Sequence, residues 1–165
     1  MKNDLSDRTV ASESGGGLHV TIRLARQNDA ERLAVLCGQL GYPSSEEEIR
    51  RRLDLIGPDE GHVIYVAEQA DRQVVGWIHA YLRPLLEEDV QAEVGGLVID
   101  EAWRNHGIGQ HLLQQVEQWA QEHGCWAVHV RSNIIRERAH RFYQRLGYSS
   151  IKTQLAFRKV LCRGE

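Results

Sequence analysis

The stretch Arg104-Asn105-His106-Gly107-Ile108-Gly109 joins a strand-like run, residues 90–99, to the most regular amphipathic pattern in the chain. Apolar residues recur at helical spacing after it, and Gly124 follows where helices favour a terminal glycine. The pattern predicts a strand, a glycine turn and a helix. A helix N-terminus presents unpaired backbone N–H groups, and glycines let an anion come close. By itself this turn predicts only an anion site.

The rest of the chain alternates between strand and helix patterns. Strands are expected at 19–24, 63–67, 74–81, 90–99 and 126–131, with one or two more between 148 and 161. Helices are expected at 30–40, 44–56, 107–123 and 139–146, each followed by a glycine. The order β-α-α-β-β-β-α-β-α-β indicates an α/β fold with helices on both faces of a mixed sheet.

Length and composition predict one domain in a soluble, cytoplasmic protein. Residues 1–18 are polar and predict a mobile tail, and residues 19–165 predict a single domain. A net charge of −3 does not favour a nucleic-acid surface, and no apolar run is long enough to span a membrane. Three cysteines without framework spacing are typical of a reduced compartment. Eight histidines show no metal-ligand spacing, so no metal is expected.

Two motifs give the turn its meaning. Leu97-Val98-Ile99-Asp100, followed by Arg104-x-x-Gly107-x-Gly109, resembles motif A of the GNAT family of N-acetyltransferases. The later run His140-x-Phe142-Tyr143-x-x-Leu146-Gly147-Tyr148 resembles motif B of that family. The resemblance extends over roughly residues 20–161. It implies a GNAT-like (acyl-CoA N-acyltransferase) fold, with a mostly antiparallel central sheet of six or seven strands.

The resemblance implies acetyl-CoA as co-substrate. Strand 90–99 would separate from strand 126–131 to admit the thioester and would pair with the pantetheine arm, while the turn's amides would hold the diphosphate. The residues so implied are Leu97, Val98, Ile99, Arg104, Asn105, His106, Gly107, Ile108, Gly109 and Gln110. Many relatives carry an asparagine seven residues before the motif B tyrosine. Arg136 stands there in this chain and Asn133 lies just upstream, so both are expected cofactor contacts.

Gly95-Gly96 lies inside the strand that precedes the turn. Paired glycines in a strand favour a β-bulge, which would help the strand separate from its neighbour. They also suit a backbone on which a tryptophan or tyrosine ring packs. Both alternatives remain open at this point.

Acetyl transfer needs a neutral amine, so a general base is expected near the acceptor. Glu93 is the candidate, because strand parity predicts that it shares a face with Leu97 and Ile99; the alternative is a solvated strand residue. Tyr143 is the candidate acid for the leaving thiolate, with a packing role as its alternative. A backbone N–H near Leu97 would meet the developing oxyanion.

The sequence therefore predicts an N-acetyltransferase that moves acetyl from acetyl-CoA to a primary amine by direct attack in a ternary complex. The acceptor stays open between a small polyamine-like or aminoglycoside-like molecule, an amino-acid derivative and a protein amine. Two alternatives are a non-catalytic acyl-CoA-binding module and a nucleotide-phosphate enzyme. A homodimer also remains an open alternative.

Overall fold

The computed structural model describes residues 7–8 and 19–161. The chain divides into two compact units, Met1–Arg131 and Ser132–Glu165. The first unit contains the sheet and three helices, and the second contains one helix. Of the expected N-terminal tail, only Asp7–Arg8 is among the described residues, as a two-residue strand.

The sheet of the first unit is mixed and mostly antiparallel, as expected. Its strands lie side by side in chain order, and every neighbouring pair is antiparallel except the last, which is parallel. The strands are β1 (Asp7–Arg8), β2 (Val20–Leu24), β3 (His62–Gln69), β4 (Val74–Arg83), β5 (Gln91–Ile99) and β6 (Val128–Val130).

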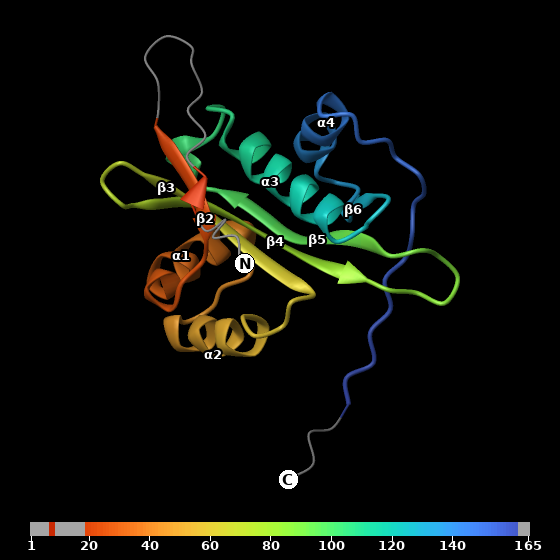
Figure 1. Cartoon of the computed structure of the whole chain (residues 1–165), viewed down its shortest axis with the longest axis horizontal. Helices are drawn as coiled ribbons and strands as arrows, with labels where there is room; N and C mark the ends of the chain where they lie inside the picture. The colour runs from red at the N-terminus through yellow and green to blue at the C-terminus, as the bar shows by residue number, and fades with distance from the viewer. Residues whose placement is uncertain (1–6, 9–18, 162–165) are drawn as a thin grey trace, which may run out of the picture. The chain divides into compact units, whose positions relative to one another are not determined.

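Helices cover both faces of this sheet (Figure 1). On one side lie α1 (Ala30–Leu40) and α2 (Glu46–Ile56), and on the other lies α3 (Ile108–Glu122). The helix ends follow the sequence signals. Ser45 and Glu48 form the expected capping box of α2, and Gly41 ends α1 with a left-handed φ of 99°.

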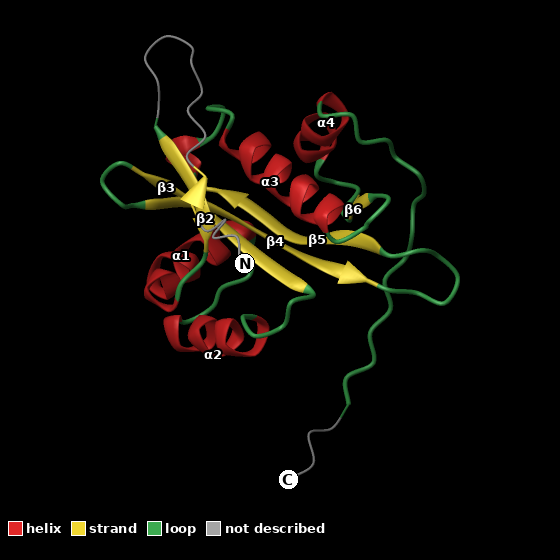
Figure 2. Ribbon diagram, viewed as in Figure 1, coloured by secondary structure: helices red, strands yellow, loops and turns green. Residues whose placement is uncertain are grey.

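The second unit differs from the prediction after its helix. Helix α4 (Glu137–Arg145) is present, but residues 148–161 form no strand, and Figure 2 draws them as loop. Apolar side chains along this segment are exposed, including Ile151, Leu155 and Phe157. A strand needs a neighbour to satisfy its backbone, and no strand of the second unit's described residues provides one. Among the described residues the sheet has five strands of three or more residues, and the predicted six is reached only by counting the two-residue β1.

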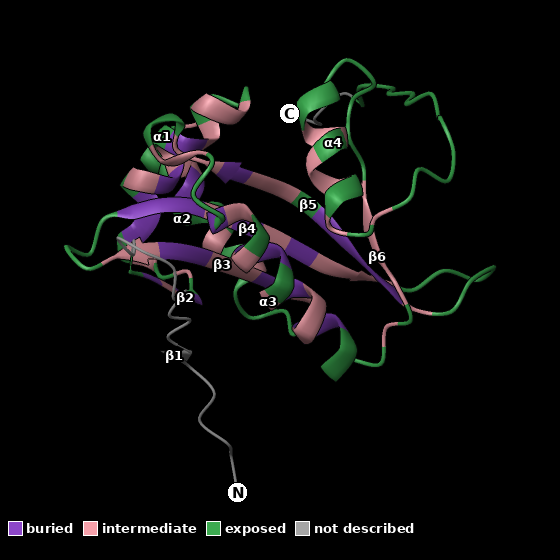
Figure 3. Ribbon diagram, turned by 90° about the horizontal axis from the view of Figure 1, so that it is seen from above, coloured by how far each residue is buried: buried purple, intermediate pink, exposed green. Residues whose placement is uncertain are grey.

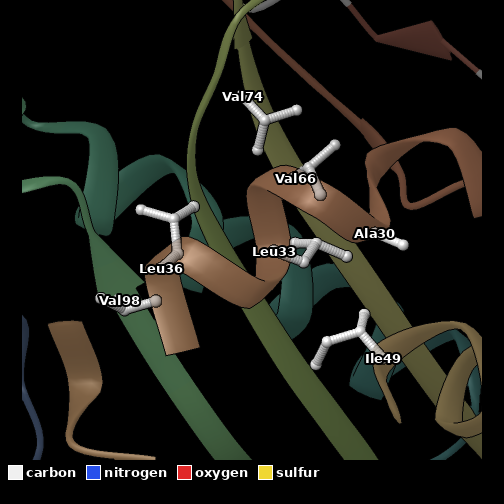
Figure 4. Packing of buried hydrophobic residues seen from close by; sticks show 7 residues of the cluster. All are labelled: Ala30, Leu33, Leu36, Ile49, Val66, Val74 and Val98. Atoms are coloured by element: carbon white, nitrogen blue, oxygen red, sulfur yellow. The ribbon is translucent and has the colours of Figure 1, made fainter. Parts of the chain in front are cut away.

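The core has a layer on each face of the sheet, and the helix faces toward the sheet are the buried ones (Figure 3). Beneath α1 and α2 lies a cluster that Figure 4 displays: Ala30, Leu33, Leu36, Ile49, Val66, Val74 and Val98. On the other face of the sheet, Leu112, Leu113 and Val116 of α3 are almost fully buried. Each buried leucine contributes about 1.5–3 kcal/mol relative to an exposed one.

Asp29 precedes α1 but does not cap it with its side chain. Its buried carboxylate instead accepts two hydrogen bonds from Arg23, both 2.8 Å, and one from the backbone N–H of Arg26 at 2.7 Å. Burial opposes ionisation of Asp29, but these donors outweigh it and hold its pKa below the usual range. The ion pair therefore joins the start of α1 to β2.

The β-bulge occurs at Gly95, and the packing of an aromatic ring on the strand occurs at Gly96. His79 of β4 pairs with Gly96, whereas Ala80 pairs with Val94, so Gly95 is the extra residue of a β-bulge. At Gly96 a Cβ would lie 2.7 Å from the ring of Trp77. The second glycine is therefore required by the packing of this tryptophan on the strand.

We expect Gly96→Ala to lower the free energy of unfolding by about 1–3 kcal/mol, because the new methyl overlaps Trp77. Gly38→Ala is the matched control. A Cβ there meets nothing within 4 Å, so helix propensity should raise stability by about 0.5–1 kcal/mol. Urea denaturation of both variants measures the difference. Equal effects would contradict the close packing at Gly96.

Candidate functional site

Strand β5 has one fully paired edge and one that is mostly free. It pairs with β4 along its whole length but with β6 only through residues 92–94. From Gly95 to Ile99 no β6 residue lies opposite β5, because β6 ends at Val130, the partner of Val94. Backbone N–H and C=O groups on such an edge can pair with an extended ligand.

The free part of β5 leads into the glycine turn. Asp100 fixes the start of this turn by accepting a hydrogen bond from the N–H of Ala102 at 2.9 Å and by an ion pair with Arg32. Arg104 folds back and donates from Nε to the carbonyl of Ile99 at 3.2 Å. The turn therefore stays close to the end of β5.

Helix α3 begins immediately after this turn. Gly107 is its N-cap residue, with a left-handed φ of 77° and no side-chain cap hydrogen bond. A Cβ at Gly107 would meet nothing within 4 Å, so the space in front of the helix is open. Asn105 also has a positive φ, 67°, which asparagine tolerates better than most residues. An uncapped helix start facing open space suits an anionic group.

The predicted face of Glu93 is wrong. Paired residues of neighbouring strands share a face, and Glu93 pairs with Tyr81 whereas Leu97 pairs with Ile78, three residues away on β4. The extra residue Gly95 reverses the alternation between the two positions. Glu93 therefore lies on the α1 side with Val98, and Leu97 lies on the α3 side.

Glu93 is buried and charge-balanced, with an exposed fraction of 2%. Arg131 donates from Nε to its Oε1 at 2.5 Å, and Nε of Arg83 lies 3.4 Å from Oε2. Tyr81 lies beside this group, and burial together with Glu93 raises the pKa of its phenol. The reading of Glu93 as a solvated strand residue is therefore excluded.

Two histidines that sequence reasoning assigned no role lie on the same face. His62 Nδ1 and His79 Nε2 are 3.0 Å apart, and both rings lie within 6.0 Å of the ring of Tyr81 by their centroids. They are 17 positions apart in the chain. Only the pairing of β3 with β4 brings them together, so no local motif could have identified them.

The second unit holds the remaining predicted residues around the start of α4. Asn133 accepts a hydrogen bond from the N–H of Ile135 through its side chain, at 3.1 Å, and one from the N–H of Arg136 through its carbonyl, at 2.9 Å. Arg136 is the N-cap residue of α4. Tyr143 packs against Phe142 and Tyr148, with ring centroids 5.1 and 5.8 Å away. Burial raises the pKa of Tyr143 to about 12, so its phenol keeps its proton at neutral pH.

Within the described part of the chain, no three His, Cys, Asp or Glu side chains are arranged to hold a metal ion. None of the described helices is long and apolar enough to cross a membrane.

Comparison with known proteins agrees with this geometry. Residues 24–148 match the acetyltransferase (GNAT) family. An aminoglycoside N(6')-acetyltransferase type 1 from Acinetobacter genomosp. 13 is 31% identical over 125 residues, covering 73% of this chain and 86% of the relative. An aminoalkylphosphonate N-acetyltransferase from Salmonella typhimurium is 33% identical over 90 residues, covering 54% of this chain and 57% of the relative.

A solved structure shows the same fold. It is an aminoglycoside N-acetyltransferase in complex with CoA, 18% identical, with a TM-score of 0.77 over 89% of this chain and 99% of its own. The chain belongs to the acetyltransferase (GNAT) family. It is an acetyl-CoA-dependent N-acetyltransferase.

The start of α3 can be tested by substitution. Gly107→Ala and Gly124→Ala both place a side chain at a positive φ, 77° and 72°, at opposite ends of α3, and each should cost about 1–2 kcal/mol of stability. Only Gly107→Ala should also weaken CoA binding, by about tenfold, which corresponds to about 1.4 kcal/mol. Calorimetric titration with CoA measures this. Equal CoA affinities in the two variants would show that the turn does not bind the diphosphate.

Proposed function

We propose that this enzyme transfers the acetyl group of acetyl-CoA to a primary amine of a small polycationic molecule of the aminoglycoside type. The single observation that carries the proposal is the continuity of the free β5 edge with the uncapped start of α3. An extended arm and a diphosphate can be held by this one run of backbone. Acetyl-CoA has both parts.

The backbone of Leu97, Val98 and Ile99 would hold the pantetheine arm, and the turn from Arg104 to Gln110 would hold the diphosphate. Bound in this way, acetyl-CoA would supply the activated acyl group for the transfer. Backbone N–H groups of the opened strand would stabilise the negative charge that develops on the carbonyl oxygen. In the second unit, Asn133 and Arg136 are proposed as further contacts to the cofactor.

Two proton transfers accompany the reaction. The acceptor ammonium must lose a proton before it attacks, because its pKa is near ~10. Glu93 and His79 are the candidate proton acceptors on the α1 side of the bulge. Tyr143 is proposed to protonate the departing thiolate, and its raised pKa keeps that proton available at neutral pH. The amine attacks directly in a ternary complex.

The proposed acceptor class rests on the relatives and on charge. The Acinetobacter relative, 86% of which is matched by this chain, is named for acetylation at the 6' position of aminoglycosides. In this chain Glu87 and Asp89 are exposed in the loop that joins β4 to β5. Carboxylates at this position would attract a polycation before it reaches the bulge.

The direct test is thiol release from acetyl-CoA with a panel of amines. The panel contains an aminoglycoside, a linear polyamine, an aminoalkylphosphonate, an amino acid amide and a lysine peptide. We expect the highest kcat/KM with the aminoglycoside and a lower value for the lysine peptide. Binding of acetyl-CoA without thiol release for every amine would favour the non-catalytic module. A preference for the phosphonate or the peptide would refute the proposed acceptor class.

Tyr143→Phe tests whether Tyr143 acts as a proton donor or only as a packing residue. The ring and its contacts with Phe142 and Tyr148 remain, so stability and CoA affinity should stay the same. Loss of the proton donor should lower kcat by about 100-fold. Steady-state kinetics and calorimetric titration measure the two quantities. An unchanged kcat would remove Tyr143 from the mechanism and leave it as a packing residue.

A further inference from the structure

The bulge at Gly95 opens beside His79. Gly95 is exposed, and a Cβ there would lie 3.3 Å from Nδ1 of His79 and 3.5 Å from the ring of Tyr81. Gly95 is also the first residue of β5 beyond its pairing with β6. Nδ1 of His79 therefore borders solvent-facing space at the point where the strands separate.

The other nitrogen of His79 is connected to a second imidazole. Nε2 lies 3.0 Å from Nδ1 of His62, and Nε2 of His62 lies 3.7 Å from the carboxylate of Asp59, which is exposed. The relay uses one of the proton arrangements that suit these three groups. His79 carries its proton on Nε2 and donates to His62, which carries its own on Nε2 toward Asp59. Nδ1 of His79 is then an acceptor that faces the opening.

The charges around the pair favour this neutral state. Burial and the neighbouring His62 lower the pKa of His79 to about 4, so its ring is neutral at pH 7. The titratable groups around the pair are Asp59 before β3, His62 on β3, Tyr81 on β4, and Glu93 with its partners Arg83 and Arg131. His129 of β6 pairs with Glu93, and its Nδ1 lies 3.4 Å from Arg83. Because a low pKa makes His79 a weak base, a proton that it accepts must pass on from its ring.

Glu93 is less suited to accept this proton. Its Oε1 accepts from Arg131, and its Oε2, which has no hydrogen-bond partner among the described residues, lies 3.4 Å from Nε of Arg83. Only 2% of Glu93 is exposed, so an acceptor amine has little access to it. By contrast, no described residue makes a hydrogen bond with Nδ1 of His79. The carboxylate balances two cations and fixes Tyr81 beside the histidines, whereas His79 retains a free lone pair next to the opening.

We propose that His79 is the general base of acetyl transfer and that His62 relays its proton to solvent past Asp59. This inference rests on the proposed function. The N–H bond of the acceptor ammonium breaks and a bond to Nδ1 of His79 forms. Nε2 of His79 then gives its proton to Nδ1 of His62, and Nε2 of His62 releases one to Asp59 or water. The freed lone pair of the amine attacks the thioester, so protons and charges balance.

The test is the pH dependence of kcat with the best amine of the panel. In the wild type, kcat should be level around neutral pH, because His79, with its pKa lowered to about 4, is neutral there. His79→Gln should lower kcat at pH 7 by about 100-fold, and its kcat should keep rising toward the pKa of the free amine near ~10. His62→Gln should lower kcat by less and move the level region to higher pH. CoA affinity should not change in either variant.

Three controls complete the experiment. His19→Gln removes an exposed histidine outside this face and should behave as the wild type. Added imidazole should restore part of the activity of His79→Ala, which loss of packing alone would not predict. Thermal melting and CoA binding check that each variant folds.

The outcomes separate the two hypotheses. A wild-type kcat and pH profile in His79→Gln would overturn the relay and leave the acetyltransferase proposal intact. A profile that changes in Glu93→Gln but not in His79→Gln would assign the base to Glu93 and also overturn the relay. No thiol release by the wild type with any amine would overturn both.

Discussion

The unequal pairing of the two edges of β5 is the constraint on which the site depends. One edge is bonded to β4 throughout, which fixes the strand in the core, while the other meets β6 for only three residues. A fully paired strand would have no backbone groups to offer a ligand, and an unpaired one would have no fixed position. The bulge at Gly95 lies where pairing with β6 stops, and the turn before α3 connects the free part of this edge to the proposed anion site.

The bulge also determines which side chains can meet the reacting atoms. It turns Glu93 to the α1 face and leaves Leu97 on the α3 face, so the polar chemistry gathers on the side away from α3. There the buried charge of Glu93 is balanced by Arg83 and Arg131, as a buried carboxylate requires. With that charge compensated, a neutral His79 can lie close by without becoming an imidazolium, and it remains available to accept a proton.

Local patterns predicted an element well where its backbone hydrogen bonds are formed within the element or with a strand close by in the chain. The helices end at their glycines, and β3 and β4 form as neighbouring strands where the sequence predicts 63–67 and 74–81. The patterns failed where the outcome depends on partners. Residues 148–161 alternate like a strand but have no strand beside them in their unit. The predicted face of Glu93 was wrong because one extra residue reverses the alternation of side chains along a strand. The two glycines in the sequence do not show which of them is unpaired.

The sequence by itself determined the family and the donor, because the glycine turn and the two motifs are short, local and chemically specific. The motif already predicts a glycine turn before a helix, and in the structure Gly107 has a left-handed φ and open space where a Cβ would be. Only the tertiary structure decided which polar side chains gather on the α1 face of β5. The face of Glu93, its two guanidinium partners and the contact of His62 with His79 arise from pairing between separate strands. Such contacts depend on register and bulges, which are fixed only when the whole sheet has formed.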